Sequence, residues 1–528
     1  MSTARPHPLG PVSARWARRP GARRTLAVLA PVLAFLALTA WGISSPVGSS
    51  PDDDFHVTSL WCEPGDRDGI CEDTEDPASR VVAFSLIGAP TCYAFRPAES
   101  GACVGQDLST FADDEMVRTE RGNFDGLYPR VFYAALSPFA GPDLEAGVLA
   151  IRTVNAALFV LVVTAVVVAV PPALRRPVVV GVVATAVPLG MFVIPSTNPS
   201  SWALLCAATL WATVLGFLRS RGRRAAVLAA LSVVVVVMGA GARADAAIFA
   251  VLALLAVGVL AARRGRPRVV ALVLPAVVAV VAFALFSTAS QGGQVATGLP
   301  NEARPDRSSG RLLFVNLLEA PRLWSGMLGE KGIGWLDTEL PASTWVLAVA
   351  VFFALLFWGV AVVDRRKALA VVGVFAALWL VPVVLLVQTG AVVGEHVQPR
   401  YVLPMAIILA GLAALPVGGR APRLTGLQAW AVVGALGVAN AVALYTNTRR
   451  YVTGTDVTAR SLDVAVEWWW PVAPSPMTSW VLGSLAFVGA LAALAVLDRL
   501  PDRPAADPGA EPGQREVPDN VAPERVAD

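Results

Sequence analysis

Charged residues are scarce in this chain. They make up 15% of its 528 residues, whereas hydrophobic residues make up 55%. A surface exposed to water on all sides needs more charge than this, so the composition excludes an ordinary soluble protein. The chain also lacks the motifs of common soluble enzymes: a phosphate-binding loop, a Gly-x-Gly-x-x-Gly fingerprint at a strand end, and a Gly-x-Ser-x-Gly elbow. Any chemistry therefore belongs to the membrane surface.

The apolar residues come in runs of roughly twenty, which is the length that crosses a bilayer as an α-helix. Short arginine-rich breaks separate the runs. The sequence therefore predicts an all-α polytopic membrane protein with about twelve transmembrane helices. The expected spans are 25–44, 148–170, 177–194, 203–218, 225–241, 246–262, 269–287, 344–363, 368–388, 401–416, 426–446 and 477–497.

Arginine and lysine gather in breaks that are separated by an even number of spans, so all these breaks can face one compartment. Short basic loops are retained in the cytosol, and we therefore expect both termini inside, an uncleaved first helix and a location in the plasma membrane. The basic charge reflects topology, so nucleic acid is not an expected partner. The breaks are 15–24, 175–176, 219–224, 263–268, 365–367, 420–423 and 499–503.

Three regions follow from this topology. Residues 1–24 form a basic cytosolic N-terminus, and residues 25–497 form the membrane domain. Residues 498–528 form a cytosolic tail that we expect to be disordered, because it is rich in Pro, Ala, Asp and Glu. The long outer loops are 45–147, 288–343, 389–400 and 447–476.

The first outer loop is acidic and contains most of the cysteine. Residues 45–147 carry 19 acids and six arginines. Four cysteines allow three connectivities, and loop length favours pairing Cys62 with Cys71 and Cys92 with Cys103. The remaining Cys206 lies in an apolar run and is expected to be packed.

A short amphipathic stretch lies in the loop 288–343. Its apolar residues 312, 313, 314, 317 and 318 would line one side of a helix that is too short to span the membrane. We predict an interfacial or re-entrant helix here.

The acids Asp52, Asp53 and Asp54 stand with His56 just after the first span. Carboxylates and an imidazole at a membrane surface can supply a general base or hold a divalent metal such as Mg or Mn. The plain alternative is a helix start, where acids in the first turn complement the helix dipole.

Several arginines fall at outer ends of spans, against the inside bias, and a charge there needs a partner. Asp245 is the simple partner for Arg243. A lipid-linked phosphate is a good partner for the planar guanidinium of Arg400, although a helix end or Glu395 could also hold it. Arg449 and Arg450 are two further arginines at the outer end of a span.

Four short blocks resemble those of the bacterial membrane-protein family known as domain of unknown function 2142, which is itself similar to the GT-C glycosyltransferases. The blocks are Pro51-Asp-Asp-Asp-Phe-His56, Asn198-Pro199, Gly334-Trp-Leu-Asp-Thr-Glu-Leu-Pro341 and Gln398-Pro-Arg-Tyr-Val-Leu-Pro404. The resemblance implies a GT-C-like helical bundle whose large first outer loop contains amphipathic helices and a catalytic acid. It also implies a polyprenyl-phosphate sugar as donor and places the catalytic acid at Asp52 or Asp53.

The expected function is that of an integral-membrane glycosyltransferase acting on a cell-envelope glycan, lipid or protein. We expect Asp53, with Asp52, to serve as base or metal ligand, and Asp54 and His56 to support them. Arg243 and Arg400 would hold the donor phosphate. The acid should lie within about 10 Å of both arginines, in a cavity of several hundred cubic ångströms. Other candidates for lining this pocket are Tyr401, Gln398, Asn198, Trp335 and Asp337.

Two rival classes stay open at this stage. A transporter or flippase for a lipid-linked precursor would share the outer arginines, although a coupled carrier usually needs charges near mid-membrane, and few are present. The other rival is a non-catalytic envelope-assembly protein.

Overall fold

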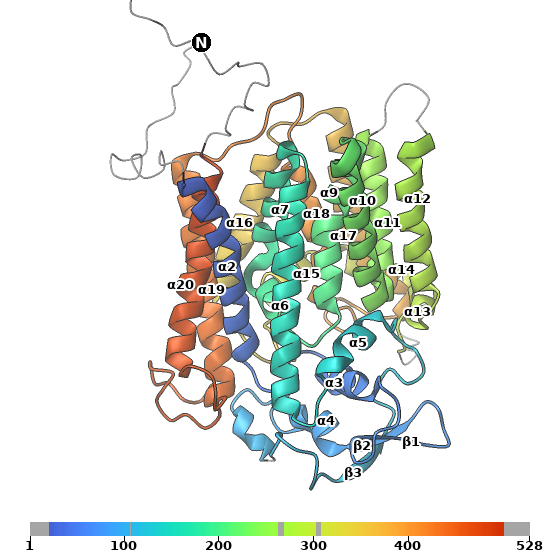
Figure 1. Ribbon diagram of the computed structural model, residues 1–528, viewed down its shortest axis with the longest axis vertical. Helices are drawn as coiled ribbons and strands as arrows, with labels where there is room; N and C mark the ends of the chain where they lie inside the picture. The colour runs from blue at the N-terminus through green and yellow to red at the C-terminus, as the bar shows by residue number, and fades with distance from the viewer. Residues whose placement is uncertain (1–20, 106, 262–268, 302–307, 501–528) are drawn as a thin grey trace, which may run out of the picture.

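The computed structural model describes residues 21–105, 107–261, 269–301 and 308–500. These residues form a bundle of long helices with a smaller folded region at one end, which we call the loop end (Figure 1). The predictions for the basic N-terminus before residue 21 and for the tail after residue 500 fall outside the described residues.

Ten helices of the described chain are long and apolar enough to cross a membrane, which confirms a multi-pass membrane protein. Each coincides with a predicted span. They are α2 (Ala22–Ile43), α6 (Leu144–Ala169), α7 (Pro172–Thr185) continued by η4 (Ala186–Gly190) and α8 (Met191–Val193), α9 (Ser200–Leu218), α10 (Gly222–Ala242), α11 (Ala244–Ala261), α16 (Ala342–Val360), α17 (Arg365–Thr389), α19 (Gly426–Val452) and α20 (Pro476–Leu497).

The other two predicted spans are also helical. Helix α12 (Val269–Phe286) has 18 residues and coincides with the predicted span 269–287. Helix α18 (Leu403–Ala413) has only 11 residues, and all of them are buried in the bundle. An apolar run as short as α18 forms a buried core helix as readily as a span, so hydropathy alone does not distinguish the two at 401–416.

The described parts of several basic breaks lie together at the end of the bundle opposite the loop end. Arg176 donates to an Asp498 oxygen at 2.5 Å and to the carbonyl of Pro422 at 2.7 Å, which joins segments that are distant in sequence. Arg499 donates to the Thr425 carbonyl at 3.1 Å. These breaks therefore share one end of the bundle, as expected if an even number of spans separates them.

The first loop folds as a compact unit at the loop end. Its helices are α3 (Asp53–Cys62), α4 (Phe84–Gly88) and α5 (Val131–Leu136), with short turns η1 (Ala89–Thr91), η2 (Gly101–Val104) and η3 (Ser137–Phe139). A three-stranded antiparallel sheet of β1 (Cys71–Asp73), β2 (Arg80–Ala83) and β3 (Met116–Thr119) covers them in the order β1-β2-β3. The predicted disulfides, Cys62 to Cys71 and Cys92 to Cys103, are both present.

The amphipathic stretch predicted after residue 311 is helical. It forms α14 (Ser309–Glu319), between α13 (Gln291–Thr297) and α15 (Pro321–Met327). Leu312 and Asn316 are buried, whereas Phe314 is 66% and Leu318 63% exposed. An exposed apolar face on a helix too short to span is typical of a helix in the membrane interface.

The topology is testable by labelling. Cys206 is buried and the other cysteines are in disulfides, so the native protein offers little reactive background. We expect a membrane-impermeant maleimide to label exposed Ser109→Cys in intact cells, and to label Arg366→Cys only after lysis. The reverse pattern would invert the orientation.

Candidate functional site

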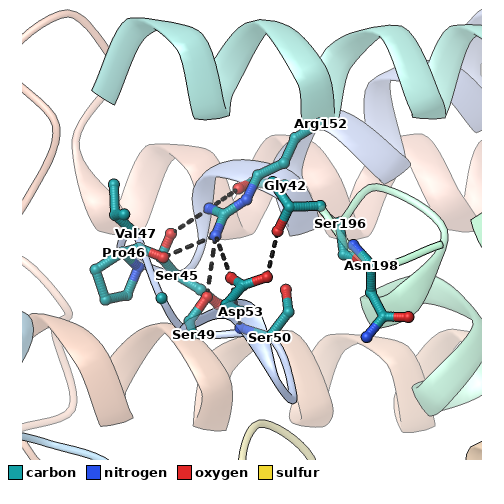
Figure 2. Close-up of polar contacts among 12 residues, drawn as sticks. Gly42, Ser45, Pro46, Val47, Ser49, Ser50, Asp53, Arg152, Ser196 and Asn198 are labelled. Carbon is teal, nitrogen blue, oxygen red and sulfur yellow. Dashed lines mark hydrogen bonds and ion pairs between the residues drawn. The ribbon is translucent and has the colours of Figure 1, made fainter. Parts of the chain in front are cut away.

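The site is built on the loop of residues 44–52 between α2 and α3. Arg152, from within the span α6, holds this loop in place (Figure 2). Its guanidinium donates to the carbonyls of Gly42, Ser45 and Pro46 at 2.9, 2.6 and 2.7 Å, and to the Ser49 hydroxyl at 3.1 Å. Gly42 lies in the last turn of α2 and the other three acceptors lie in the loop, where no helix or sheet supplies a donor, so the 3% exposed arginine supplies it.

Asp53 belongs to the same buried network (Figure 2). One carboxylate oxygen accepts from the Ser50 amide at 3.0 Å and lies 3.9 Å from Arg152, and the other accepts from the Thr197 hydroxyl. The side chain is fully buried. Burial raises the pKa of Asp53 to about 6, against the lowering effects of Arg152 and Thr197. Its oxygens are thus committed to holding the loop.

Asp52 faces the opposite way. Its backbone is left-handed, with φ 60° and ψ 24°, a conformation that Asp tolerates better than most residues. This turn separates adjacent carboxylates, and an Asp52 oxygen lies 2.5 Å from Nη2 of Arg400. Burial alone would raise the pKa of Asp52, but Arg400 and other nearby cations lower it below its ordinary value. The Asp52 side chain is 34% exposed, so this carboxylate is ionised and accessible.

Arg400 lies in η5 (Pro399–Tyr401), directly before the buried helix α18. Its side chain is 3% exposed. Nη2 is paired with Asp52, but Nε and Nη1 are buried without a hydrogen-bond acceptor anywhere in the described chain. Buried guanidinium groups are normally satisfied, so these two N–H positions could donate to an anion.

A second guanidinium converges on the same place. Arg243, at the C-terminal end of α10, donates to both oxygens of Asp245 at 2.9 and 2.7 Å, the simple pairing that the sequence suggested. The ring of Tyr401 lies 5.1 Å from Arg243 and 5.1 Å from Arg400, measured to each guanidinium carbon. One tyrosine therefore separates two arginines, and cation–π contact with its ring offsets part of their mutual repulsion.

Aromatic side chains enclose His56 beside Asp52. The rings of Phe55, Tyr128 and Tyr133 lie 5.2 to 6.2 Å from the imidazole, and Nδ1 is 2.9 Å from the Tyr133 hydroxyl. Burial lowers the pKa of His56 to about 3, so the imidazole is neutral at neutral pH. Its Nε2 is buried and has no partner among the described residues.

The residues do not fit the metal site considered from the sequence. Asp54 turns away and forms a two-bond pair with Arg121 at 2.8 and 2.7 Å. Within the described ranges no three His, Cys, Asp or Glu side chains are grouped as ligands. Asp52 is paired with a cation, which leaves no carboxylate set for Mg or Mn.

Comparison with known proteins gives the family. The family described as "predicted membrane protein (DUF2142)" matches residues 35–409, which is most of the chain. The chain belongs to this family. No curated protein and no solved structure matches it. The family match supports a membrane protein and assigns no activity.

The family blocks converge from distant parts of the chain on the loop 44–52. Asn198 donates to the Pro51 carbonyl at 2.9 Å, directly before Asp52, and accepts from the Ser200 amide, so it supports the loop. Trp335 donates to the Gly48 carbonyl at 3.0 Å. Gln398 precedes η5 and has a buried oxygen without a partner within the described chain.

The remaining candidates belong to a neighbouring network. Asp337 pairs with buried Arg450 at 3.1 Å and so is not free to line a pocket. Arg449 donates to the carbonyls of Ala459 and Ser461, which stabilises a loop. Two cavities were found away from Asp52: one of about 220 Å³ that includes Lys367 at the opposite end, and an apolar groove of about 300 Å³ along α16 and α17. Neither is the predicted cavity.

Sequence reasoning missed Arg152, Thr197, Tyr128 and Arg121. Arg152 did carry a signal, because it is a lone charge inside the apolar run 148–170 and such residues nearly always have a defined partner. The others could not be found from spacing, since their contacts depend on how the first loop folds.

Arg152 should be essential for stability. Arg152→Met leaves Asp53 and four loop acceptors without their cation, and we expect a loss of about 3–5 kcal/mol of unfolding free energy. The control Arg130→Met removes an exposed pair with Glu63 and should cost no more than about 1 kcal/mol. Denaturant unfolding in detergent measures both. Equal losses would contradict the assigned role.

Proposed function

We propose that this protein transfers a sugar from a polyprenyl-phosphate donor to a cell-envelope acceptor, at the outer face of the plasma membrane. The observation that carries the proposal is the Arg400 guanidinium, whose Nε and Nη1 are buried without acceptors among the described residues while Nη2 contacts Asp52. An anionic ligand that carries a phosphate would satisfy both positions, and Arg243, which is itself paired with Asp245, lies on the other side of the Tyr401 ring.

The same arrangement supplies the groups that a direct displacement needs. The hydroxyl oxygen of the acceptor forms a bond to C1 of the donor sugar, and Asp52 accepts the proton that this hydroxyl loses. The bond from C1 to the phosphate oxygen breaks, and the polyprenyl phosphate leaves with the electron pair. Arg400 and Arg243 stabilise the charge that develops on it. Attack from the face opposite the leaving group inverts the configuration at C1.

Asp52 is the base in this proposal, and Asp53 is a positioning residue. A base must reach the proton it removes, and Asp52 is partly exposed whereas Asp53 is fully buried in contact with Ser50, Thr197 and Arg152. The low pKa of Asp52 keeps it ionised at neutral pH. The proposal therefore assigns the role of base to Asp52, whereas the sequence analysis favoured Asp53 for it.

Neutral His56 supplies a further polar atom beside the base. Its buried Nε2 has no partner among the described residues, and the neutral ring adds no positive charge next to Asp52. The cluster thus provides one ionised base, one neutral imidazole and two cations, which is the division of roles that glycosyl transfer from a phosphate requires.

The proposal predicts the consequence of removing the base. In a gene-deletion strain, lipid-linked sugar should accumulate and one envelope glycan should be lost. We expect the wild-type gene to restore the product and Asp52→Asn to lower turnover by a factor of about 10²–10⁴, with donor binding retained. Envelope glycan profiling and donor-consumption assays measure these effects. Full activity of Asp52→Asn would favour a flippase or an assembly protein.

The pH dependence follows from the pKa of Asp52. Because the pKa of Asp52 is lowered, its carboxylate becomes half protonated only at a pH below 3.8, the ordinary pKa of an aspartate. Lowering the pH from about 7 to 5 should therefore leave the ionised fraction of Asp52 unchanged. A pH profile of kcat/KM with an acid limb that is assigned to Asp52 above pH 5 would contradict this environment.

Arg400→Lys should separate charge from geometry. Lysine keeps one positive charge but lacks the planar guanidinium, so the two N–H donors at Nε and Nη1 are lost. We expect the donor KM to rise about tenfold or more, with a smaller change in kcat. The control is Arg449→Lys, a buried arginine at the same end that contacts Tyr445, Thr453 and the carbonyls of Ala459 and Ser461; it should lower stability and leave the donor KM unchanged.

A further inference from the structure

A second surface at the loop end is formed by two segments that are far apart in sequence. Phe95 lies in the disulfide-closed segment 92–103, and Trp335 lies in the loop before α16. Their ring centroids are 5.9 Å apart and the rings are inclined by 66°. Phe95 is 69% exposed, and Leu336 beside Trp335 is 41% exposed. We call Phe95, Trp335 and Leu336 the aromatic shelf.

The shelf is held in place by strained backbone. Phe95 and Leu336 have φ of 62° and 64°, although bulky side chains disfavour this left-handed region by roughly 1 kcal/mol or more each. An exposed apolar side chain gains little from burial, so folding alone gives no reason to hold these two residues this way. Strain that presents apolar side chains to the outside is typical of a binding surface.

A buried ion pair fixes the two halves of the shelf together. Asp337 accepts from the Phe95 amide at 2.9 Å and pairs with Arg450 at 3.1 Å. Arg450 is fully buried and also donates to the carbonyls of Tyr93 and Glu99, in the segment that carries Phe95. The shelf is therefore a rigid surface, which lowers the entropy cost of binding.

The shelf is connected to the candidate base. The Trp335 indole donates to the Gly48 carbonyl, and Gly48 precedes Asp52 by four residues, a separation of at most about 14 Å along the chain. Because its N–H is fixed on the protein, the indole cannot turn away, and its ring stays beside Phe95.

We infer that the aromatic shelf binds the carbohydrate part of the acceptor, next to the base Asp52. This inference rests on the proposed function and adds the acceptor class to it. A sugar ring has an apolar C–H face that stacks on the electron-rich face of an aromatic ring, and the exposed ring of Phe95, held against Trp335, offers such a face. An acceptor of more than one sugar unit can lie on the shelf and present its terminal hydroxyl to Asp52.

The test uses purified protein in nanodiscs and fluorescently labelled oligosaccharides released from the envelope of the deletion strain. We expect Phe95→Ala to weaken binding about tenfold and Phe95→Tyr to retain it, since the ring is kept. Phe139→Ala is the matched control, because Phe139 is a 40% exposed phenylalanine of the first loop outside the shelf, and it should bind like the wild type.

The outcomes separate the two proposals. Unchanged binding by Phe95→Ala, or no binding by the wild type, would overturn the shelf and leave the Asp52 turnover result standing. If Phe95→Ala keeps oligosaccharide binding but loses thermal stability only in bilayers, the shelf is a membrane anchor and the inference fails. Loss of binding in Phe95→Ala with full turnover in Asp52→Asn would retain a carbohydrate site and refute the transferase.

Discussion

The contact of Arg152 with the loop after α2 is the constraint on which the candidate site depends. A lone arginine inside a span costs several kcal/mol unless its donors are satisfied. Here three carbonyls and one hydroxyl accept from it, and Asp53 supplies the counter-charge. The loop in turn has no regular structure that could satisfy those carbonyls. Arg152 and the carbonyls it contacts thus each avoid the free-energy cost of a buried polar group without a hydrogen bond. The segment that leads into α3 is fixed in one conformation as a result.

This constraint gives two adjacent acids different chemistry. Asp53 faces inward, where burial raises its pKa, while the left-handed backbone at Asp52 directs the neighbouring carboxylate to Arg400, where cations lower its pKa. Pairs of titratable groups whose environments push their pKa values apart identify residues with different roles. The buried acid maintains the backbone, and the accessible acid is available to a substrate.

Hydropathy predicted the membrane spans because apolar length is a direct requirement of the bilayer. The helix predicted at 401–416 is shorter than expected, because α18 covers only Leu403–Ala413 and is buried in the bundle. The cysteine pairing followed from loop length. The convergence of Asp52, Arg243 and Arg400 at one membrane face followed from alternating topology. The choice between Asp52 and Asp53 could not follow, because it depends on a single backbone dihedral angle, and the contacts of Tyr128 and Thr197 depend on tertiary packing that no short pattern encodes.

The shortness of α18 has a consequence for Arg400. All 11 residues of the helix are buried, so it begins inside the bundle and the turn η5 before it is covered as well. A full-length span would have brought Arg400 to the surface, where water satisfies a guanidinium. Within the bundle, Nε and Nη1 have no acceptor among the described residues, while Asp52 pairs with only one side of the group. A buried cation in that state gains more from an incoming anion than an exposed one does, because the interaction is not screened by solvent. The short helix and the buried arginine are therefore two aspects of one arrangement, in which a short core helix places a positive charge inside the bundle.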